Sequence, residues 1–269
     1  MESPEQQFAY IRDRYIGSNF IINKAKMPGF SGREIRQLDK KGKLTRDKVL
    51  FLTFDDWGTD ESINKLLYVL DKYGVKATFF VLTEHVEANP NLLRSIAEAG
   101  HEIASHTNSH EPLADANENF TRYSSLTAEE QEAERRDLVT SYEKLNQYVG
   151  DISVDGKRAL SLDFRPPTLE VSKEGLYQVF DVGFQYSVSG DVSTNDYEKT
   201  DLNKFIQSMM HGSPSSEDGY KVGSGSIIVM HMTESAKCTA QMLDTMIPYW
   251  QQQGYAFARI DDYIDRFEP

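Results

Sequence analysis

Two adjacent carboxylates, Asp55 and Asp56, follow a run of large, mostly apolar residues, Val49–Phe54. An apolar run of this length is typical of a strand buried on both faces in an α/β sheet or barrel. Two carboxylates this close repel each other and are costly to desolvate unless a cation or a proton is shared between them. The pair therefore indicates a site at the carboxyl end of a parallel strand, where α/β proteins place their chemistry. A plain turn or helix cap is the competing interpretation, because Asp is favoured in both.

Two histidines, His106 and His110, are four residues apart in a polar segment that follows a short predicted strand, Glu102–Ala104. If the segment is one turn of helix, both imidazoles project from one face and can reach a single metal ion. Two histidines and one carboxylate suit a catalytic Zn²⁺, and Co²⁺, Mn²⁺ or Ni²⁺ would also fit. Taken alone the spacing is weak evidence, and two polar loop residues are the simpler interpretation. His101 precedes the strand, so we expect it to be structural.

Three more polar segments follow predicted strands. Arg165 is stiffened by two prolines, and a guanidinium held in this way can bind a carboxylate through two hydrogen bonds. A surface turn explains the same residues equally well. The acids of Ser189–Tyr197 could brace this arginine. His231 ends a buried strand, where a lone histidine is more often a hydrogen-bonded core residue.

The elements that must position these residues alternate between strands and helices, which predicts parallel strands and right-handed crossovers. The predicted strands are Val49–Phe54, Ala77–Leu82, Glu102–Ala104, Leu162–Phe164, Phe184–Val188, Ser226–His231 and Ala256–Ile260. The predicted helices are Gln6–Ile16, Thr59–Tyr73, Asn89–Ala99, a long helix opening at Thr127, Gly175–Asp181, Leu202–Met210 and Thr239–Gln252. This number of units favours barrel closure over an open sheet. We therefore expect an α/β fold, a (β/α) barrel with seven strands.

Two details of the predicted elements can be checked directly. Thr127 and Glu130 form a capping box at the start of the long helix. The acidic face of that helix is expected to be solvated; its residues are Glu129, Glu130, Glu132 and Glu134. We divide the chain into an N-terminal extension or linker, residues 1–45, and a main domain, residues 46–269.

Composition excludes several classes of protein. The 269 residues carry a formal net charge of -13, with a pI near 4.9, which argues against a nucleic-acid partner. No run of about 18 apolar residues is present, so we expect no transmembrane segment. The first residues, Met1–Asp13, lack the basic start and apolar core of a signal peptide. The single cysteine, Cys238, excludes an internal disulfide.

Taken together, the order and spacing of these segments resemble the polysaccharide deacetylases of carbohydrate esterase family 4. The resemblance covers roughly Lys48 to Ile264 and includes all five motifs of the family. Its most specific part is the joint match of Thr53-Phe54-Asp55-Asp56 with His106-x-x-x-His110. It implies a distorted (β/α) barrel that removes acetyl groups from N-acetylglucosamine polymers or, in some members, from acetylated xylan.

The resemblance also implies a role for each matching residue. Asp55 would be the general base, and Asp56, His106 and His110 would be the metal ligands. Arg165 would orient Asp55, and Asp196 would brace Arg165. His231 would be the general acid, and Val229 would line the pocket for the acetyl methyl group. No serine nucleophile is needed for this chemistry, and the chain shows no Gly-x-Ser-x-Gly elbow that would supply one.

The chain departs from the family pattern where substrate contacts are expected. Trp57-Gly58 replaces the usual Gly-Pro after Asp56, and Trp57 could stack on a sugar or pack under the next helix. Thr168 replaces a tyrosine, which keeps a backbone N–H but removes a ring. Tyr197 replaces a tryptophan, and Ser193 replaces an acid, for which Asp191 is the candidate substitute. The substrate-binding residues that we expect are Trp57, Pro167, Thr168, Tyr197 and Val229.

Three functions therefore stay open at this point. The first is metal-dependent removal of acetyl groups from N-acetylglucosamine residues of a polysaccharide, either peptidoglycan or a chitin-like polymer. The second is an O-acetyl esterase on acetylated xylan, and the third is a noncatalytic carbohydrate-binding relative. The resemblance implies an extracellular or cell-surface location, because such substrates lie outside the cytoplasm.

Overall fold

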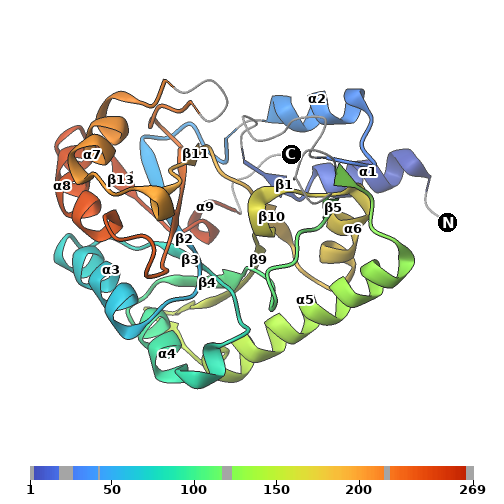
Figure 1. The fold of residues 1–269 in the computed structure, drawn as a ribbon, viewed down its shortest axis with the longest axis horizontal. Coiled ribbons are helices and arrows are strands. Elements are labelled where there is room, and N and C mark those ends of the chain that lie inside the picture. The colour runs from blue at the N-terminus through green and yellow to red at the C-terminus, as the bar shows by residue number, and fades with distance from the viewer. Residues whose placement is uncertain (1–2, 18–26, 42, 117–122, 215–218, 265–269) are drawn as a thin grey trace.

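Parallel strands form a curled sheet with helices packed on its outside (Figure 1). The computed structural model of the chain describes residues 3–17, 27–41, 43–116, 123–214 and 219–264. In spatial order the strands are β1 (Tyr15–Ile16), β10 (Tyr186–Val188), β9 (Leu160–Phe164), β4 (Glu102–Ser105), β3 (Thr78–Val81), β2 (Val49–Asp56), β12 (Ile227–His231) and β11 (Val192–Ser193), and β13 (Ala256–Phe257) pairs with β2. All of these pairings are parallel.

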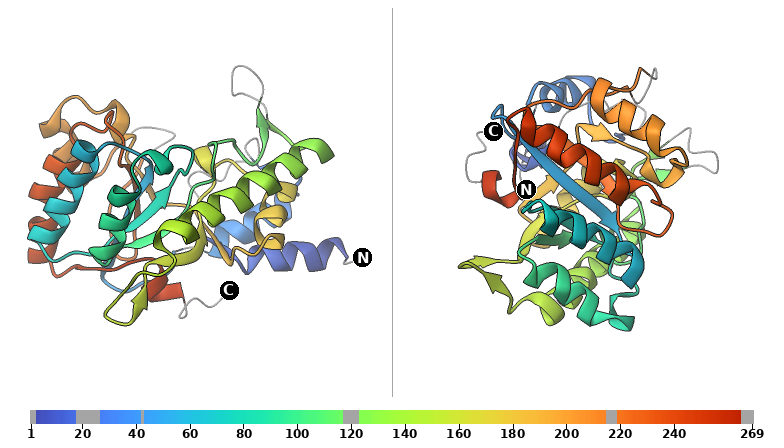
Figure 2. Two further views of the ribbon diagram at one scale, coloured as in Figure 1. Left: turned by 90° about the horizontal axis from the view of Figure 1, so that it is seen from below. Right: turned by 90° about the vertical axis from the view of Figure 1, so that its left-hand side faces the viewer.

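The remaining elements surround this sheet. The helices are α1 (Pro4–Arg12), α2 (Gly32–Lys41), α3 (Asp60–Lys72), α4 (Pro90–Glu98), α5 (Ala128–Val149), α6 (Lys173–Asp181), α7 (Leu202–His211), α8 (Thr239–Gln252) and α9 (Asp261–Ile264). Two short hairpins are β5 (Asp115–Ala116) with β6 (Tyr123–Ser124) and β7 (Ser153–Val154) with β8 (Lys157–Arg158). Helices α3 and α8 lie side by side on the outside of the sheet in both views of Figure 2. No helix in the described part of the chain is long and apolar enough to cross a membrane.

The predicted barrel is confirmed in shape, but the prediction of seven strands is wrong. Among the described residues, eight strands lie along the path of the sheet, and β13 adds a ninth beside β2. The end strands β1 and β11 are each two residues long, too short to leave an apolar run in the sequence. The path ends at these two strands, so the sheet is a curled half-barrel.

The sequence predicts one helix over Gln6–Ile16, and this prediction is wrong. The segment divides into a helix and a strand. Helix α1 ends at Arg12, and Tyr15–Ile16 then pairs with β10 as the edge strand β1. Phe8 and Ile11 of α1 are buried against the apolar side chains of α6. The described residues before Gly17 therefore pack on the sheet. Parts of both predicted domains lie outside the described residues, and the division at residue 45 stays a prediction.

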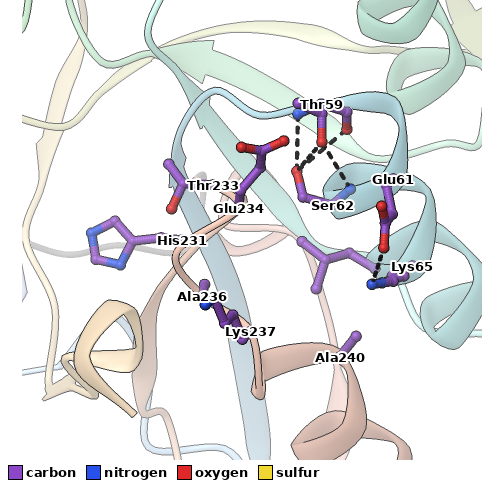
Figure 3. Close-up of a pocket in the computed structure, with 11 residues that line it drawn as sticks. Thr59, Glu61, Ser62, Lys65, His231, Thr233, Glu234, Ala236, Lys237 and Ala240 are labelled. Atoms are coloured by element: carbon purple, nitrogen blue, oxygen red, sulfur yellow. Dashed lines mark hydrogen bonds and ion pairs between the residues drawn. The ribbon is translucent and has the colours of Figure 1, made fainter. Parts of the chain in front are cut away.

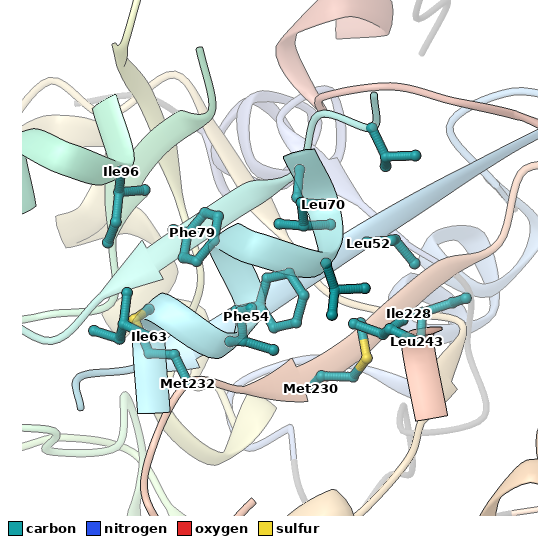
Figure 4. Close-up of a cluster of buried hydrophobic side chains, with 14 of the residues drawn as sticks. Leu52, Phe54, Ile63, Leu70, Phe79, Ile96, Ile228, Met230, Met232 and Leu243 are labelled. Atoms are coloured by element: carbon teal, nitrogen blue, oxygen red, sulfur yellow. The ribbon is translucent and has the colours of Figure 1, made fainter. Parts of the chain in front are cut away.

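Alternate residues of β2 supply two different cores, as the two-residue period of a strand requires. Leu50, Leu52 and Phe54 pack outward against α3 and α8 in a large apolar cluster (Figure 4). Val49 and Phe51 point the other way, into an interior cluster enclosed by the curled sheet. Thr53 and Asp55 continue this inward series, so the strand carries a carboxylate to the carboxyl end of the barrel interior.

The long helix α5 begins as predicted, but its acidic face is only partly solvated. Thr127 Oγ1 accepts a hydrogen bond from the N–H of Glu130, and the Glu130 carboxylate accepts one from the N–H of Thr127. Glu134 departs from the prediction, because both of its carboxylate oxygens are buried without a hydrogen-bond partner. Burial, together with the neighbouring Asp137, raises the pKa of Glu134 to about 9. Helix α5 therefore presents part of its acidic face to the protein and not to solvent.

Candidate active site

Asp55 and Asp56 leave the end of β2 in different directions. Asp55 continues the inward series and is 3% exposed, and it lies directly opposite His231 in the register of β2 with β12. Asp56 has a left-handed backbone with φ 76°, a conformation that costs an L-residue about 1–2 kcal/mol. This turn directs its carboxylate toward His106 and His110 rather than toward Arg165.

Three side chains converge at a point where a metal ion would fit. Asp56 Oδ1 lies 3.4 Å from His106 Nε2 and 3.3 Å from His110 Nε2. Tetrahedral Zn²⁺ with ligands at about 2.0–2.1 Å requires ligand atoms about 3.3–3.4 Å apart, so the spacing suits it. Among the His, Cys, Asp and Glu side chains of the described residues, these three could share a metal ion, because their ligand atoms all lie within 4.8 Å of one another.

The hydrogen bonds around this group are also those of a metal site. His106 Nδ1 lies 2.7 Å from the carbonyl oxygen of Arg165, which can only accept, so Nδ1 carries the proton and Nε2 keeps its lone pair. Asp56 Oδ1 is buried and has no hydrogen-bond partner. Burial alone would raise the pKa of Asp56, but His106 and His110 hold it well below its usual range. A carboxylate that stays ionised between two imidazoles fits a cation.

A loop brings the two histidines together. Residues 106–110 do not form the single helical turn that would also place both imidazoles on one face. The segment His106–His110 has no helix, and within it Thr107 and His110 have left-handed backbones, with φ 72° and 62°. The N–H of His110 donates to Thr107 Oγ1 across the loop, at 3.0 Å. His101, by contrast, is structural as expected: it is buried, and its Nδ1 accepts from the N–H of Ala77.

Arg165 holds Asp55 from beneath, inside the barrel. It is fully buried, and its Nη1 donates to Asp55 Oδ1 at 2.8 Å and to Thr53 Oγ1 at 2.7 Å. Its Nε and Nη2 donate to the carbonyl oxygens of Val188 and Ser189. The planar fork of a guanidinium suits several fixed acceptors of this kind. One oxygen of Asp55 is thereby held in place, and Oδ2 lies 4.0 Å from His106 Nε2.

Asp196 does not brace Arg165, so this part of the prediction is wrong. Asp196 is buried, and its Oδ1 lies 2.6 Å from His231 Nδ1, while its Oδ2 accepts from the N–H of His231 and from Thr239 Oγ1. The reason is positional, because the turn after β11 places Asp196 beside the end of β12. Backbone carbonyls of the β10 segment occupy the place of the expected acid at Arg165.

The contact with Asp196 changes the proton affinity of His231. Burial would lower the pKa of His231, but the hydrogen bond and charge of Asp196, aided by Asp55 and Asp56, raise it to about 9. The imidazole is therefore protonated at neutral pH. Its Nδ1 is committed to Asp196, so Nε2 is the atom that can give a proton to another molecule. The rings of Tyr197 and His231 are arranged edge to face, with 5.1 Å between their centroids.

Two cavities flank these residues and contain part of the expected substrate site. Figure 3 shows one of about 410 Å³ between the first turn of α3 and the segment after β12, with His231 at its edge. The other, about 580 Å³, is lined by Asp56, Trp57 and His110 among others. Trp57 also packs against the outer apolar cluster, so it both supports the core and lines the cavity.

The other predicted substrate-binding residues differ in their exposure to solvent. Tyr197 is 45% exposed beside His231, whereas Val229, two residues before it on β12, is only 4% exposed. Pro167 is buried, and Thr168 is exposed with a left-handed backbone, its hydroxyl donating to the Glu170 carboxylate. The binding roles of these residues stay predictions.

Sequence reasoning missed the residues that support the site. Asp137 on α5 contacts the loop formed by His106–His110, called the histidine loop below. Ser141 on the same helix contacts Ser105, directly before that loop, and Thr239 at the start of α8 donates to Asp196. Each of these contacts joins residues far apart in the chain, so no local motif marks them.

Comparison with known proteins then decides the family. A family model described as polysaccharide deacetylase matches residues 42–187, which is more than half of the 269 residues. The chain belongs to the polysaccharide deacetylase family. The resemblance stated from the sequence motifs is thereby confirmed, and so is the barrel fold that it implied.

Similar proteins within the family include peptidoglycan deacetylases. The chain is 27% identical over 94% of its length to a peptidoglycan-N-acetylglucosamine deacetylase of Bacillus cereus, of which it covers 81%. It is 28% identical over 97% of its length to that of Listeria monocytogenes, but it spans only 47% of that longer protein. The crystal structure of the Bc1960 peptidoglycan N-acetylglucosamine deacetylase has 26% identity and a TM-score of 0.63, covering 81% of this chain and 88% of that one.

Membership of the polysaccharide deacetylase family does not by itself establish catalysis. Solved structures with a similar fold include a pseudoenzyme of carbohydrate esterase family 4, BA3943 from Bacillus anthracis. Whether a member is active therefore depends on the side chains at its site.

Proposed function

We propose that this polysaccharide deacetylase is a metal-dependent enzyme that removes acetyl groups from N-acetylglucosamine residues of peptidoglycan. A chitin-like polymer is the second substrate to test. The observation that carries the proposal is the convergence of the buried Asp56 Oδ1 with His106 Nε2 and His110 Nε2. This triad lies beside a carboxylate held by a buried arginine and a histidine that is protonated at neutral pH.

Asp56, His106 and His110 would hold one divalent cation, for which Zn²⁺ is the first choice and Co²⁺, Mn²⁺ or Ni²⁺ are alternatives. Such an ion supplies a Lewis acid that polarises a carbonyl and lowers the pKa of water. The residues fit it because Nε2 of His106, Nε2 of His110 and the Asp56 carboxylate oxygen face the same point, and His106 Nε2 keeps its lone pair.

Asp55 is the general base of this proposal. Its carboxylate accepts the proton of the water that attacks the acetyl carbonyl, and Arg165 keeps the carboxylate oriented during the transfer. Arg165 Nη1 binds Asp55 Oδ1 at 2.8 Å, so Asp55 Oδ2 is the oxygen that we assign to the proton transfer. The backbone N–H of Thr168 is the donor that we assign to the developing oxyanion.

His231 is the general acid. It gives the proton on Nε2 to the amide nitrogen as the C–N bond breaks, so acetate and a free amine leave the site. Asp196 keeps His231 protonated until that step. Because Asp55 and His231 face each other in register across β2 and β12, base and acid approach one substrate group from adjacent strands.

Peptidoglycan is the proposed polymer because the similar proteins from Bacillus cereus and Listeria monocytogenes are named for that activity. Activity on the cell wall would place the enzyme outside the cytoplasm or at the cell surface. Trp57 and Tyr197 are the aromatic side chains that we assign to sugar contacts, since both lie beside the triad or His231.

Acetate release from purified substrates tests this function. The protein is incubated with Zn²⁺ and peptidoglycan, chitooligosaccharides or acetylated xylan, with His106→Ala as the inactive control. We expect acetate from the N-acetylated substrates, fastest from peptidoglycan. Release only from xylan would indicate an O-acetyl esterase, and no release from any substrate would indicate a noncatalytic carbohydrate-binding relative.

A further inference from the structure

The carboxylate of Asp137 on α5 binds the middle of the histidine loop, although the two segments are 28–29 residues apart. Asp137 Oδ2 accepts from the N–H of Asn108 at 2.8 Å and from the N–H of Ser109 at 3.4 Å. Asp137 Oδ1 accepts from the Ser109 hydroxyl at 2.6 Å. Hydrogen bonds to an ionised acceptor are roughly twice as strong as neutral ones. One side chain thus restrains two consecutive residues between His106 and His110.

A second side chain of the same helix supports the start of this loop. Ser141 lies four residues after Asp137, on the same face of α5, and is fully buried. Its hydroxyl is 2.5 Å from that of Ser105, and Ser105 Oγ in turn accepts from the N–H of Thr107 at 3.1 Å. Helix α5 packs on β4, the strand that leads into the loop (Figure 1).

The loop needs this support because its backbone is strained. Thr107 and His110 both have positive φ, and a residue in such a conformation costs about 1–3 kcal/mol unless its surroundings hold it there. Thr107 is also β-branched, which makes the conformation less favourable. Without restraint, relaxation of either residue would rotate the segment that carries His110.

The two histidines depend on the loop to different degrees. His106 directly follows β4, and its ring is also fixed by the carbonyl of Arg165. His110 lies at the far end of the loop, its side chain is 38% exposed, and its N–H bonds to Thr107 within the loop. The position of His110 Nε2 relative to Asp56 therefore depends on the conformation of residues 107–109.

We propose that Asp137 is a positioning residue for metal binding: it holds the histidine loop in the conformation that keeps His110 Nε2 at the triad. Ser141 is the second contact of the same helix face. This inference rests on the proposed function for its consequence, since it assumes that the triad binds a metal. The contacts between Asp137 and the loop use none of the three ligand atoms, so the positioning itself can be measured separately from metal binding.

Two measurements separate positioning from general destabilisation. The first is amide hydrogen exchange in the metal-free protein, read for the peptide that spans residues 106–110. The second is the Zn²⁺ dissociation constant, measured by competition with a chromophoric chelator. The variants are Asp137→Ala, Asp137→Asn and the milder Ser109→Ala, which removes only the hydroxyl contact. Glu143→Gln is the matched control, because Glu143 is exposed on the same helix.

We expect Asp137→Ala to increase exchange at Asn108 and Ser109 and to weaken Zn²⁺ binding by about 10- to 100-fold. Asp137→Asn and Ser109→Ala should show the same changes to a smaller extent, and Glu143→Gln should match the wild type. Acetate release by Asp137→Ala should recover in part at saturating Zn²⁺, which a misfolded protein would not do.

Wild-type exchange across residues 106–110 in both Asp137→Ala and Ser109→Ala would overturn the inference, as would faster exchange with an unchanged Zn²⁺ dissociation constant. If the wild-type protein itself binds no Zn²⁺, the proposed function fails, and the assignment of Asp137 to metal binding is overturned with it.

Discussion

His231 Nδ1 lies 2.6 Å from Asp196 Oδ1, and the backbone N–H of His231 donates to the other oxygen of the same carboxylate. Asp196 is fully buried and also accepts from Thr239, so it is fixed from three directions. The pair determines both the tautomer of His231 and the pH range in which it is protonated. Asp196, which follows β11, therefore determines the protonation of His231, the proposed general acid at the end of β12.

Asp196→Asn should move the alkaline limb of the activity profile to lower pH. The pKa of His231, about 9 in the native protein, falls when the charge of Asp196 is removed, because burial then dominates. The acid form is lost as pH rises, so we expect acetate release at pH 8 to fall by about 10²-fold. The measurement is kcat/KM against pH for the variant, the wild type and Glu198→Gln, an exposed neighbour. An unshifted alkaline limb would exclude His231 as the acid.

The same contact makes a signed prediction for stability. The native pKa of His231 is raised above its ordinary value of about 6.5, so Asp196 stabilises the fold fully below that pH. This contribution is lost as pH rises through about 9. The difference in free energy of unfolding between wild type and Asp196→Asn should therefore be larger at pH 6 than at pH 10, by urea denaturation. A difference that grows with pH would contradict the assignment.

Asp55→Asn should abolish turnover while leaving metal binding intact. Asparagine cannot take a proton from water, and a general base contributes about 10²–10⁴-fold to rate. Asp55 Oδ2 is 4.0 Å from His106 Nε2, further than the atoms of the triad are from one another, so Zn²⁺ affinity should change little. Acetate release and Zn²⁺ titration are measured on the same preparation. A variant that keeps a near-wild-type rate would show that another group is the base.

Arg165→Met should destabilise the fold strongly. The substitution leaves the buried Asp55 without its cation and removes donors from the carbonyls of Val188 and Ser189. Breaking a buried ion pair in this way costs about 3–5 kcal/mol. Arg136→Met is the control, because Arg136 and Glu132 form an exposed pair worth less than about 1 kcal/mol. Equal denaturation midpoints for the two variants would mean that Arg165 is not a structural support.

Asp163→Asn should stabilise the protein at neutral and alkaline pH. Burial and the nearby Glu102 raise the pKa of Asp163 well above its usual value. A carboxyl whose native pKa is raised loses stability as pH rises above its unfolded value, and asparagine removes that loss. The melting temperature of the variant should exceed that of wild type at pH 8 and converge with it near pH 4. Asp47→Asn, at an exposed carboxylate, should show no such trend.

The sequence predicted the central strands and the triad because their signals are local. Val49–Phe54 is a continuous apolar run ending in acids, and the two histidines have a fixed spacing within one segment. By contrast, Tyr15–Ile16 is a strand only because β10 offers a free edge, and two residues carry no periodic pattern. The helical turn considered for His106–His110 failed for a related reason, since the loop is held in left-handed conformations by contacts from elsewhere.

Pairings between distant polar residues could not be deduced from residue types. The family resemblance implies that Asp196 braces Arg165, but the fold places Asp196 against His231 and gives Arg165 backbone carbonyls. Likewise, Glu134 belongs to a helix whose composition is typical of a solvated surface, yet its carboxylate is covered. Which polar side chain is buried depends on tertiary packing, which local patterns do not encode.

Zn²⁺ titration coupled to acetate release tests the central claim most directly. Protein stripped with a chelator is titrated with Zn²⁺, and both binding and acetate release from peptidoglycan are followed, with Asp56→Asn as the variant and Asp60→Asn as the control. We predict one ion bound per chain, with activity that rises in step with occupancy, is greatly reduced in Asp56→Asn and is unchanged in Asp60→Asn. Full activity in the stripped protein, or no Zn²⁺ binding by the wild type, would contradict the account.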